Sequence, residues 1–379
     1  MLKPRHQVGV YHTPDYFSVD KSLELLIKDW GGEDQIFPKN STVLLKVNLL
    51  FAYRPEQACT THPKLVESIA RKLIKRNNRV LIGDSPGGWI SLSTMDKIFT
   101  VTGMKKAAIN SGAELISFDQ GVKQYSIPRA AKLFQIKLTD IMEKVDFIIS
   151  IPKLKTHGLT LLTGAVKLNY GFIPGSLKGE LHVRFPDFRD FADVILDLSE
   201  VCPSDLIIVD AIQSMEGNGP AGGTPINTSL LVGGVNPLEV DYILAKIMGY
   251  TNPLEIPFLQ QARQRKLLNP EKIKLQLRTD SWIYPDFKKI TKPGLFLPPH
   301  LSRMLLKIAG TKVVFNLDKC QHCNRCIFSC PAKALAKGPT IDRRKCISCF
   351  CCQENCQYSA IYSEKPWLGK VLEKIWGNA

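Results

Sequence analysis

Two runs of cysteines near the C-terminus constrain the fold of this chain more than any other feature. Both have the spacing C-x-x-C-x-x-C-x-x-x-C, and their members are Cys320, Cys323, Cys326 and Cys330 in the first run and Cys346, Cys349, Cys352 and Cys356 in the second. Three cysteines at this spacing can hold one iron–sulfur cluster while the fourth reaches the other cluster. The spacing therefore predicts two 4Fe-4S clusters with crossed ligands: Cys320, Cys323, Cys326 and Cys356 for one, and Cys346, Cys349, Cys352 and Cys330 for the other.

Other uses of cysteine fit this pattern less well. Structural zinc sites usually combine C-x-x-C pairs that are a dozen or more residues apart, and disulfide frameworks are typical of short secreted chains. The second run has Gln357 where the first has Pro331, which allows the backbone to leave the second run by a different turn. Cys351 lies outside the pattern, and we favour a small buried apolar residue beside a cluster over an additional ligand.

Composition and the N-terminal sequence bear on the location of the protein. The chain has 379 residues, of which 44% are hydrophobic and 22% charged, as is ordinary for a globular protein with a sizeable core. No apolar stretch approaches the roughly 18 residues of a membrane helix, and the first residues do not form a signal-peptide pattern. We therefore expect a cytoplasmic protein without a transmembrane segment, in a compartment that keeps thiols reduced.

The formal net charge of +15 is the strongest compositional deviation. A basic surface can attract nucleic acid, anionic lipid or acidic proteins. The densest basic runs, residues 71–76 and 263–266, are not interleaved with aromatic residues as a base-stacking surface would be. We therefore favour an acidic redox partner protein or an anionic small-molecule substrate over nucleic acid.

Residues 1–250 show alternating strand and helix patterns. Strands are expected at residues 8–11, 42–47, 79–83, 146–151, 206–209 and 230–233, and helices at 19–30, 63–75, 94–102, 187–201 and 237–248. Wholly apolar strand centres, such as residues 43–45 and 147–149, are typical of strands covered on both faces. This order predicts an α/β domain with a largely parallel sheet layered with helices.

Three further segments follow this α/β domain. Residues 251–310 are rich in proline and are expected to form a partly helical extension and linker. Residues 311–363 should form a small ferredoxin-like α+β module with two 4Fe-4S clusters. Residues 364–379 have apolar residues at helical spacing, which predicts an amphipathic helix that either docks on the large domain or contacts a membrane surface or partner.

Polar residues are concentrated where the predicted parallel strands end, which is where ligands bind in open α/β sheets. Lysine and asparagine side chains there would suit a carboxylate or phosphate group, and the candidates for substrate binding are Lys46, Asn48, Lys153, Lys155, Lys167 and Asn169. The candidates for catalytic acid–base chemistry or for positioning a cation are His157, Asp84, Asp210 and Glu216. Each residue alone has a structural explanation, but their combination favours a binding site.

Several short motifs together resemble the family named domain of unknown function 362. They are T-T-H-P at 60–63, G-D-S-P at 83–86, I-P-K-L-K-T-H at 151–157, T-G-A-V-K-L-N at 163–169, and D-A-I at 210–212 followed by E-G-N-G-P at 216–220. Many members of that family are similar in having a C-terminal ferredoxin-type module. The resemblance implies cluster binding and redox work but supplies no substrate and no proven catalytic residues.

These observations lead to one main functional hypothesis and two alternatives. We expect electron transfer between two 4Fe-4S clusters and an anionic substrate or cofactor in the α/β domain, which would make the chain an oxidoreductase if it is an enzyme. The first alternative is a non-catalytic electron carrier or assembly factor that docks on a larger redox enzyme. The second is a nucleic-acid- or metabolite-binding protein in which the clusters are structural.

Overall fold

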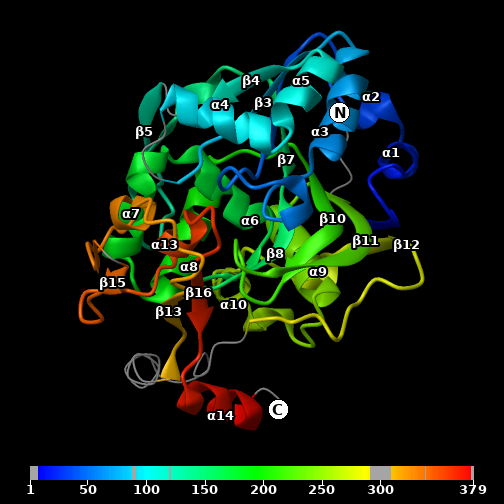
Figure 1. Cartoon of the computed structure of the whole chain (residues 1–379). Coiled ribbons are helices and arrows are strands. Elements are labelled where there is room, and N and C mark those ends of the chain that lie inside the picture. The colour runs from blue at the N-terminus through cyan, green and yellow to red at the C-terminus, as the bar shows by residue number, and fades with distance from the viewer. Residues whose placement is uncertain (1–6, 88–90, 119–120, 291–308, 338, 377–379) are drawn as a thin grey trace.

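A ten-stranded, mostly parallel mixed sheet forms the centre of the molecule (Figure 1). The computed structural model describes residues 7–87, 91–118, 121–290, 309–337 and 339–376. The strands in sheet order are β12 (Lys274–Arg278), β1 (Gln7–His12), β11 (Thr224–Gly234), β10 (Leu206–Glu216), β7 (Phe147–Ile151), β2 (Thr42–Val47), β3 (Arg79–Asp84) and β4 (Glu114–Ser117). Strand β8 (Lys153–His157) pairs with β10, and β9 (Leu161–Thr163) pairs with β8.

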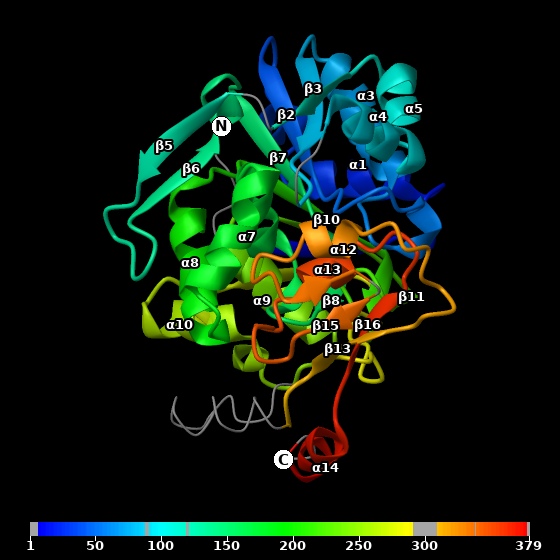
Figure 2. The same ribbon diagram turned by 60° about the vertical axis from the view of Figure 1, so that its left-hand side comes forward.

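Helices cover both faces of this sheet (Figure 2). One face packs against α1 (Val19–Asp29), α3 (Pro63–Ile74), α4 (Leu92–Val101) and α5 (Met104–Ser111), and the other against α6 (Ala165–Leu168), α8 (Phe188–Val201), α9 (Pro237–Ile247) and α10 (Pro257–Gln264). Successive strand residues point to opposite faces, so that Leu44 and Ile148 belong to one core and Leu45 and Ile149 to the other. The predicted α/β fold class is confirmed.

The helix boundaries follow local signals in the sequence. Helix α3 has Pro63 at its first position, and the His62 side chain accepts a hydrogen bond from the Lys64 backbone N–H at 3.2 Å. Helix α9 has the same arrangement, with Asn236 as the cap before Pro237. The other α-helices and strands described in the large domain are α2 (Glu33–Ile36), α7 (Gly175–Arg184) and the antiparallel pair β5 (Val122–Ser126) and β6 (Gln135–Thr139).

Part of the proline-rich segment belongs to the large domain. Helix α10 packs within its core, and β12 extends the sheet by pairing in parallel with β1. Residues 291–308, where the rest of the extension and linker was expected, lie outside the described residues. Among the helices that the structure describes, none has the length and apolar character needed to cross a membrane.

The cysteine-rich module is a small α+β unit with its own core. It contains the antiparallel pairs β13 (Lys312–Phe315) with β16 (Ile361–Glu364) and β14 (Leu335–Ala336) with β15 (Thr340–Ile341), together with α12 (Arg325–Phe328) and α13 (Cys351–Glu354). Its core includes Val313, Phe350 and Ile361. Helix α14 (Trp367–Trp376) lies apart from the large sheet in both views (Figures 1 and 2), and Trp367 is 77% exposed.

Polar contacts and one cation–π contact hold the module against the large domain. The Tyr53 hydroxyl lies 3.2 Å from the Glu354 carbonyl and 3.0 Å from the Cys356 carbonyl. The Gln353 side-chain amide donates to the Asn218 carbonyl at 2.9 Å. The Arg325 guanidinium lies 4.4 Å from the centre of the Phe51 ring. The two units are therefore joined by contacts on both α12 and α13.

Candidate functional site

A cavity of about 430 Å³ lies between the large domain and the cysteine module. Strands β10, β7, β2 and β3 run parallel, so their carboxyl ends meet at one edge, and the module covers part of that edge. Six of the ten substrate-binding and catalytic candidates line the cavity: Lys46, Asn48, Asp84, Lys155, His157 and Lys167. The module contributes Phe328, Ser329, Pro331, Cys351, Glu354 and Asn355.

Lys46 and Asp84 form a buried ion pair in the cavity wall. The Lys46 ammonium lies 2.7 Å from Asp84 Oδ1, and neither side chain is more than 6% exposed. Asp84 Oδ2 also accepts a hydrogen bond from the Leu49 backbone N–H at 2.8 Å. A Cβ atom on Gly171 would lie 2.3 Å from Lys46 Nζ, so only glycine fits this position without movement of the pair. Burial lowers the pKa of Lys46, and the Asp84 carboxylate opposes that shift.

Lys155 and Lys167 differ from Lys46 because neither has a carboxylate partner among the described residues. Lys155 is 1% exposed and donates to Asn48 Oδ1 at 3.0 Å and to the Cys59 carbonyl. Burial lowers the pKa of Lys155 to about 8 and also lowers that of Lys167. The Lys167 ammonium lies 5.0 Å from the centre of the Tyr170 ring and makes no hydrogen bond with the residues that the structure describes. Neither ammonium group therefore forms an ion pair with a described carboxylate, although the charge of Glu354 acts on both from across the cavity.

His157 and Glu354 connect the large domain to the module across the cavity. His157 Nδ1 accepts hydrogen bonds from the backbone N–H groups of Leu159 and Thr160, so the ring proton is assigned to Nε2. That nitrogen lies 3.0 Å from Glu354 Oε1. Burial lowers the pKa of His157 to about 4. Burial alone would raise the pKa of Glu354, but the His157 hydrogen bond and the Lys167 charge lower it to about 2. A neutral imidazole therefore donates to an ionised carboxylate.

Two buried polar atoms of cavity residues have no hydrogen-bond partner among the described residues. They are Thr163 Oγ1 and His182 Nδ1, and the two residues are 2% and 4% exposed. The His182 ring stacks on Phe191, with ring centres 4.7 Å apart, and contacts Tyr170 at 5.7 Å. Because unpaired buried polar groups cost free energy, these atoms are suited to pair with a ligand.

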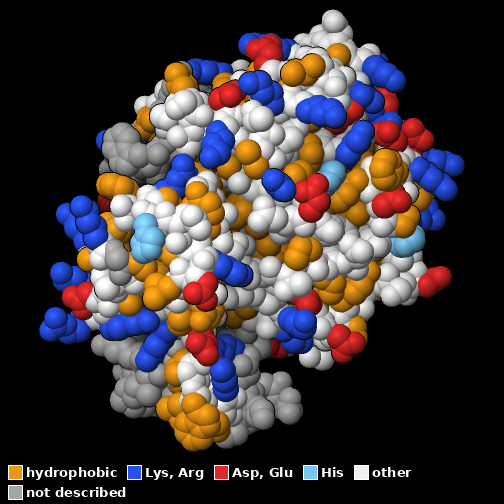
Figure 3. Space-filling model, viewed as in Figure 1, with side chains coloured by type: hydrophobic (Ala, Val, Ile, Leu, Met, Phe, Trp, Pro, Cys, Tyr) orange, Lys and Arg blue, Asp and Glu red, His pale blue; other side chains and the backbone are white. Residues whose placement is uncertain are grey.

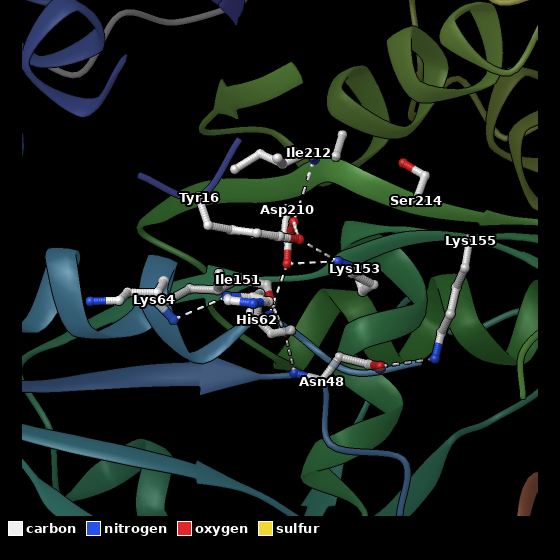
Figure 4. A network of polar contacts seen from close by, with 12 residues as sticks. Tyr16, Asn48, His62, Lys64, Ile151, Lys153, Lys155, Asp210, Ile212 and Ser214 are labelled. Carbon is white, nitrogen blue, oxygen red and sulfur yellow. Dashed lines mark hydrogen bonds and ion pairs between the residues drawn. The ribbon is translucent and has the colours of Figure 1, made fainter. Parts of the chain in front are cut away.

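Two further candidates, Lys153 and Asp210, form a separate network (Figure 4). Asp210 accepts from the Lys153 ammonium at 2.9 Å, from the Tyr16 hydroxyl at 2.9 Å and from the His62 backbone N–H at 2.8 Å. Both side chains are fully buried, and neither residue lines the cavity. The network joins the start of α3 to β8 and β10 and is therefore expected to stabilise the fold.

Glu216 and Asn169 also lie outside the cavity lining. Glu216 accepts from the Lys288 backbone N–H at 2.9 Å and is 6% exposed. Asn169 is 1% exposed and donates to Ser199 Oγ at 3.1 Å. Neither residue is placed to touch a ligand in the cavity.

Several cavity residues were not among the sequence candidates. Cys351 and Glu354 lie within the second cysteine run, where the spacing indicates cluster ligands and not a cavity wall. Lys178 and His182 lie on α7, which belongs to no recognisable motif. Gly179 of the same helix closely approaches Pro331 of the module, with 3.1 Å between an added Cβ and the proline Cβ, but this proximity depends on how the module docks and leaves no signal in the sequence.

The cysteines of the module surround two small cavities. One is lined by Cys320, Cys323, Cys326 and Cys356, and the other by Cys330, Cys346, Cys349 and Cys352. These groupings are the same as the crossed ligand sets, and four thiolates per cavity suit a 4Fe-4S cluster. The cysteine donor sets therefore fit the clusters, while the ligation itself stays a prediction.

The two cysteine runs also repeat the same backbone conformation. Left-handed φ values of 49° to 64° occur at equivalent positions of the runs: His322 and Ser348, Asn324 and Phe350, Lys333 and Ser359. The fourth cysteine of each run accepts a backbone N–H hydrogen bond, from Ala334 at 3.2 Å and from Ala360 at 3.3 Å. The exit turns are therefore alike, although the second run has no proline.

Comparisons with known proteins agree with this organisation. A model for a 4Fe-4S binding domain matches residues 312–335, which contain the first cysteine run, so the chain carries a 4Fe-4S binding domain. A thylakoid-associated protein of Synechocystis sp. is 28% identical over 301 residues, which cover 76% of this chain and 88% of that protein.

Similar solved structures are distant. The lactate racemase apoprotein of Thermoanaerobacterium thermosaccharolyticum has a TM-score of 0.40 at 12% identity, over 63% of this chain and 57% of that chain. A protein of Thermotoga maritima has a TM-score of 0.36 at 12% identity, over 57% of this chain and 54% of its own. The family model described as domain of unknown function (DUF362) matches residues 43–246, more than half of the chain, and the chain belongs to that family.

Proposed function

We propose that this protein binds two 4Fe-4S clusters and exchanges electrons between them and an anionic substrate or cofactor in the cavity, as an oxidoreductase. The observation that supports this proposal is the shared wall between the cavity and α13. Cys351, which lines the cavity, is the direct neighbour of Cys352, a predicted cluster ligand. A ligand in the cavity would thus lie beside a residue that is the sequence neighbour of a ligand of the second cluster.

The cavity side chains have distinct proposed roles. The clusters, when bound, supply or accept single electrons. Lys155 and Lys167 would bind the negative charge of the ligand, and Asn48 would orient Lys155. The Lys46–Asp84 pair would keep the cavity wall rigid, and His157 would fix the position of Glu354 on the module. Proton transfer is a further proposed role for His157 and Asp84, which both line the cavity.

The proposal is tested by anaerobic purification followed by iron and sulfide analysis, and by electron paramagnetic resonance before and after reduction. We expect about eight iron and eight sulfide per chain, as two 4Fe-4S clusters require, and signals that reductants and oxidants interconvert. Mass spectrometry of co-purified small molecules would identify ligand candidates, which are then tested as oxidants of the reduced protein. Zinc in place of iron, or clusters that no reagent reduces, would overturn the proposal.

The Lys155→Met variant separates this function from its alternatives. In an oxidoreductase it should slow reoxidation by the ligand without changing the iron content, because it removes an anion-binding group. Lys274→Met, at an exposed position of β12, is the control for loss of one positive charge. Equal rates in the two variants would favour a carrier that does not use the cavity.

A non-catalytic carrier is the second candidate, because the module has an accessible basic surface. Cys323 is exposed, and so are Lys337, Arg343, Arg344 and Lys345 around β15. Figure 3 shows lysine and arginine side chains along the left edge of the molecule, where Figure 1 places β15. An acidic redox protein would fit this surface. Cross-linking to an acidic partner and a steep salt dependence of electron transfer would support this candidate.

We expect the protein to work in the cytoplasm, where thiols remain reduced. The relative from Synechocystis sp. is named as thylakoid-associated, which makes attachment to a membrane surface the alternative. The exposed Trp367 at the start of α14 is a candidate contact for that case. Cell fractionation with Trp367→Ser as the comparison would distinguish the two locations.

A further inference from the structure

We infer that Lys155, Lys167, Thr163 and His182 form a subsite for one carboxylate or phosphate group of the cavity ligand. That the ligand is a redox substrate rests on the proposed function. The inference adds the place in the cavity at which the charged group of the ligand binds. The four residues come from β8, β9, α6 and α7 and line the same cavity.

Lys167 is the first line of evidence. Holding an ammonium group at a partly buried position costs free energy unless an opposite charge or hydrogen bonds compensate. Lys167 contacts the Tyr170 ring face, and within the described part of the chain it has no hydrogen bond or ion pair. Asp84 is paired with Lys46. Glu354 accepts from His157, and its charge acts on Lys167 without a direct ion pair. An anionic ligand would supply a direct partner for the Lys167 ammonium.

The unpaired atoms of Thr163 and His182 are independent evidence. The threonine hydroxyl can donate one hydrogen bond, and a neutral imidazole can donate one from whichever nitrogen carries the proton. The His182 ring stacks on Phe191 and makes a tilted contact with Tyr170, and neither contact satisfies Nδ1. Two ammonium groups and two neutral donors are a suitable set for the several oxygens of a carboxylate or phosphate group.

The volume and lining of the cavity indicate what kind of molecule carries this group. About 430 Å³ lies within the usual range for small organic ligands and is larger than a single inorganic ion needs. Leu50, Leu168 and Val183 add apolar lining. The ligand class is therefore an organic carboxylate or phosphate ester with an apolar portion.

The subsite is close to the second cysteine set, which gives it an electrostatic consequence. Cys351 lines the large cavity, and its sequence neighbour Cys352 lines the small cavity of the second cysteine set. Adding an electron to a cluster at this set would therefore weaken the binding of an anion. By reciprocity, a bound anion would make reduction of that cluster harder.

Isothermal titration calorimetry on the anaerobically reconstituted, oxidised full-length protein tests the subsite with malonate and inorganic phosphate as probes. The tighter probe identifies the preferred anion type. Lys167→Met should weaken binding about ten-fold or more, as expected for loss of a charge-assisted hydrogen bond. Lys246→Met is the matched control, because Lys246 is also partly buried and lies 5.5 Å over the Tyr242 ring outside the cavity. Wild-type affinity in Lys167→Met, or no binding of either probe, would overturn the inference.

Two additional measurements keep the outcomes distinguishable. Thr163→Val, which nearly preserves side-chain shape, should also weaken binding, and it replaces Lys167→Met if that variant does not fold. Reduction of the clusters should weaken binding of the tighter probe about five-fold or more. If binding depends on Lys167 but the clusters cannot be reduced, the proposed function fails and the subsite stands. If the clusters are redox-active but neither probe binds, the subsite alone fails.

Discussion

At the scale of single residues, the lysines of the carboxyl edge divide according to their partners. Lys46 and Lys153 each have a buried carboxylate, Asp84 and Asp210, at 2.7 and 2.9 Å. Among the described residues, Lys155 donates only to neutral oxygen acceptors. A buried ion pair is costly to break from one side, whereas an unpaired buried charge is costly to keep. We therefore expect Lys46 and Lys153 to be structural, and we propose that ligand binding compensates the burial of Lys155 and Lys167.

This division predicts different effects of two similar substitutions on stability. Lys46→Met leaves the Asp84 carboxylate buried without its partner and should lower the free energy of unfolding by about 3–5 kcal/mol. Lys167→Met leaves no hydrogen-bond acceptor without its partner, so the free energy of unfolding should stay unchanged or rise. Urea unfolding followed by circular dichroism checks both variants. A loss in Lys167→Met as large as that in Lys46→Met would contradict the assignment of Lys167 to ligand binding.

The pH dependence of stability provides a second test at the residue scale. Burial lowers the pKa of His182 to about 3, so between pH 6.5 and pH 3 the unfolded chain binds a proton there that the folded chain does not. Stability is therefore lost as the pH falls through this range, by about 1.4 kcal/mol per pH unit for one such group. His182→Phe should lose less stability than the wild type between pH 6.5 and 5. Parallel curves for the two proteins would show that His182 does not titrate as proposed.

At the scale of elements, the module consists of two similar loops, each followed by a short helix, α12 or α13. The repeated left-handed residues and the N–H···S hydrogen bonds show that the runs are structurally equivalent. Each small cavity nevertheless takes its fourth cysteine from the other run. The arrangement makes each cluster site depend on both halves of the module.

The crossed arrangement predicts which cluster each cysteine supports. Cys330 belongs to the first run, but Cys330→Ala should remove the second cluster. The iron content should then fall from about eight to about four atoms per chain. The remaining cluster should keep its paramagnetic resonance signal. Cys351→Ala is the control and should retain all the iron, since Cys351 lines the large cavity and neither small one. If Cys351→Ala lost as much iron as Cys330→Ala, Cys351 would be identified as a cluster ligand.

At the scale of the whole molecule, the cavity exists because the module sits on the carboxyl edge of the sheet. Tyr53 follows β2, and its hydroxyl contacts two carbonyls of the α13 segment. Tyr53→Phe should loosen this contact by about 0.5–1.5 kcal/mol. Hydrogen exchange should become faster in residues 351–356 and stay unchanged in β2 and β7. Unchanged exchange in residues 351–356 would show that other contacts hold the module.

Local patterns in the sequence determined much of this protein. The apolar strand centres fixed β2 at the predicted residues 42–47, and the cysteine spacing predicted the small module. These features depend on neighbours in the chain, which explains why the sequence reveals them. The large sheet and its helical layers also follow from such patterns.

Only the tertiary structure decided which polar residues share a site. Lys153 and Lys155 look alike in sequence, yet an irregular pairing of β8 with β10 places Lys153 beside Asp210 and Lys155 beside Met215. Glu354 reaches His157 from a segment 197 residues away. Contacts of this kind depend on strand register and on how the module docks, and neither is encoded in a local pattern.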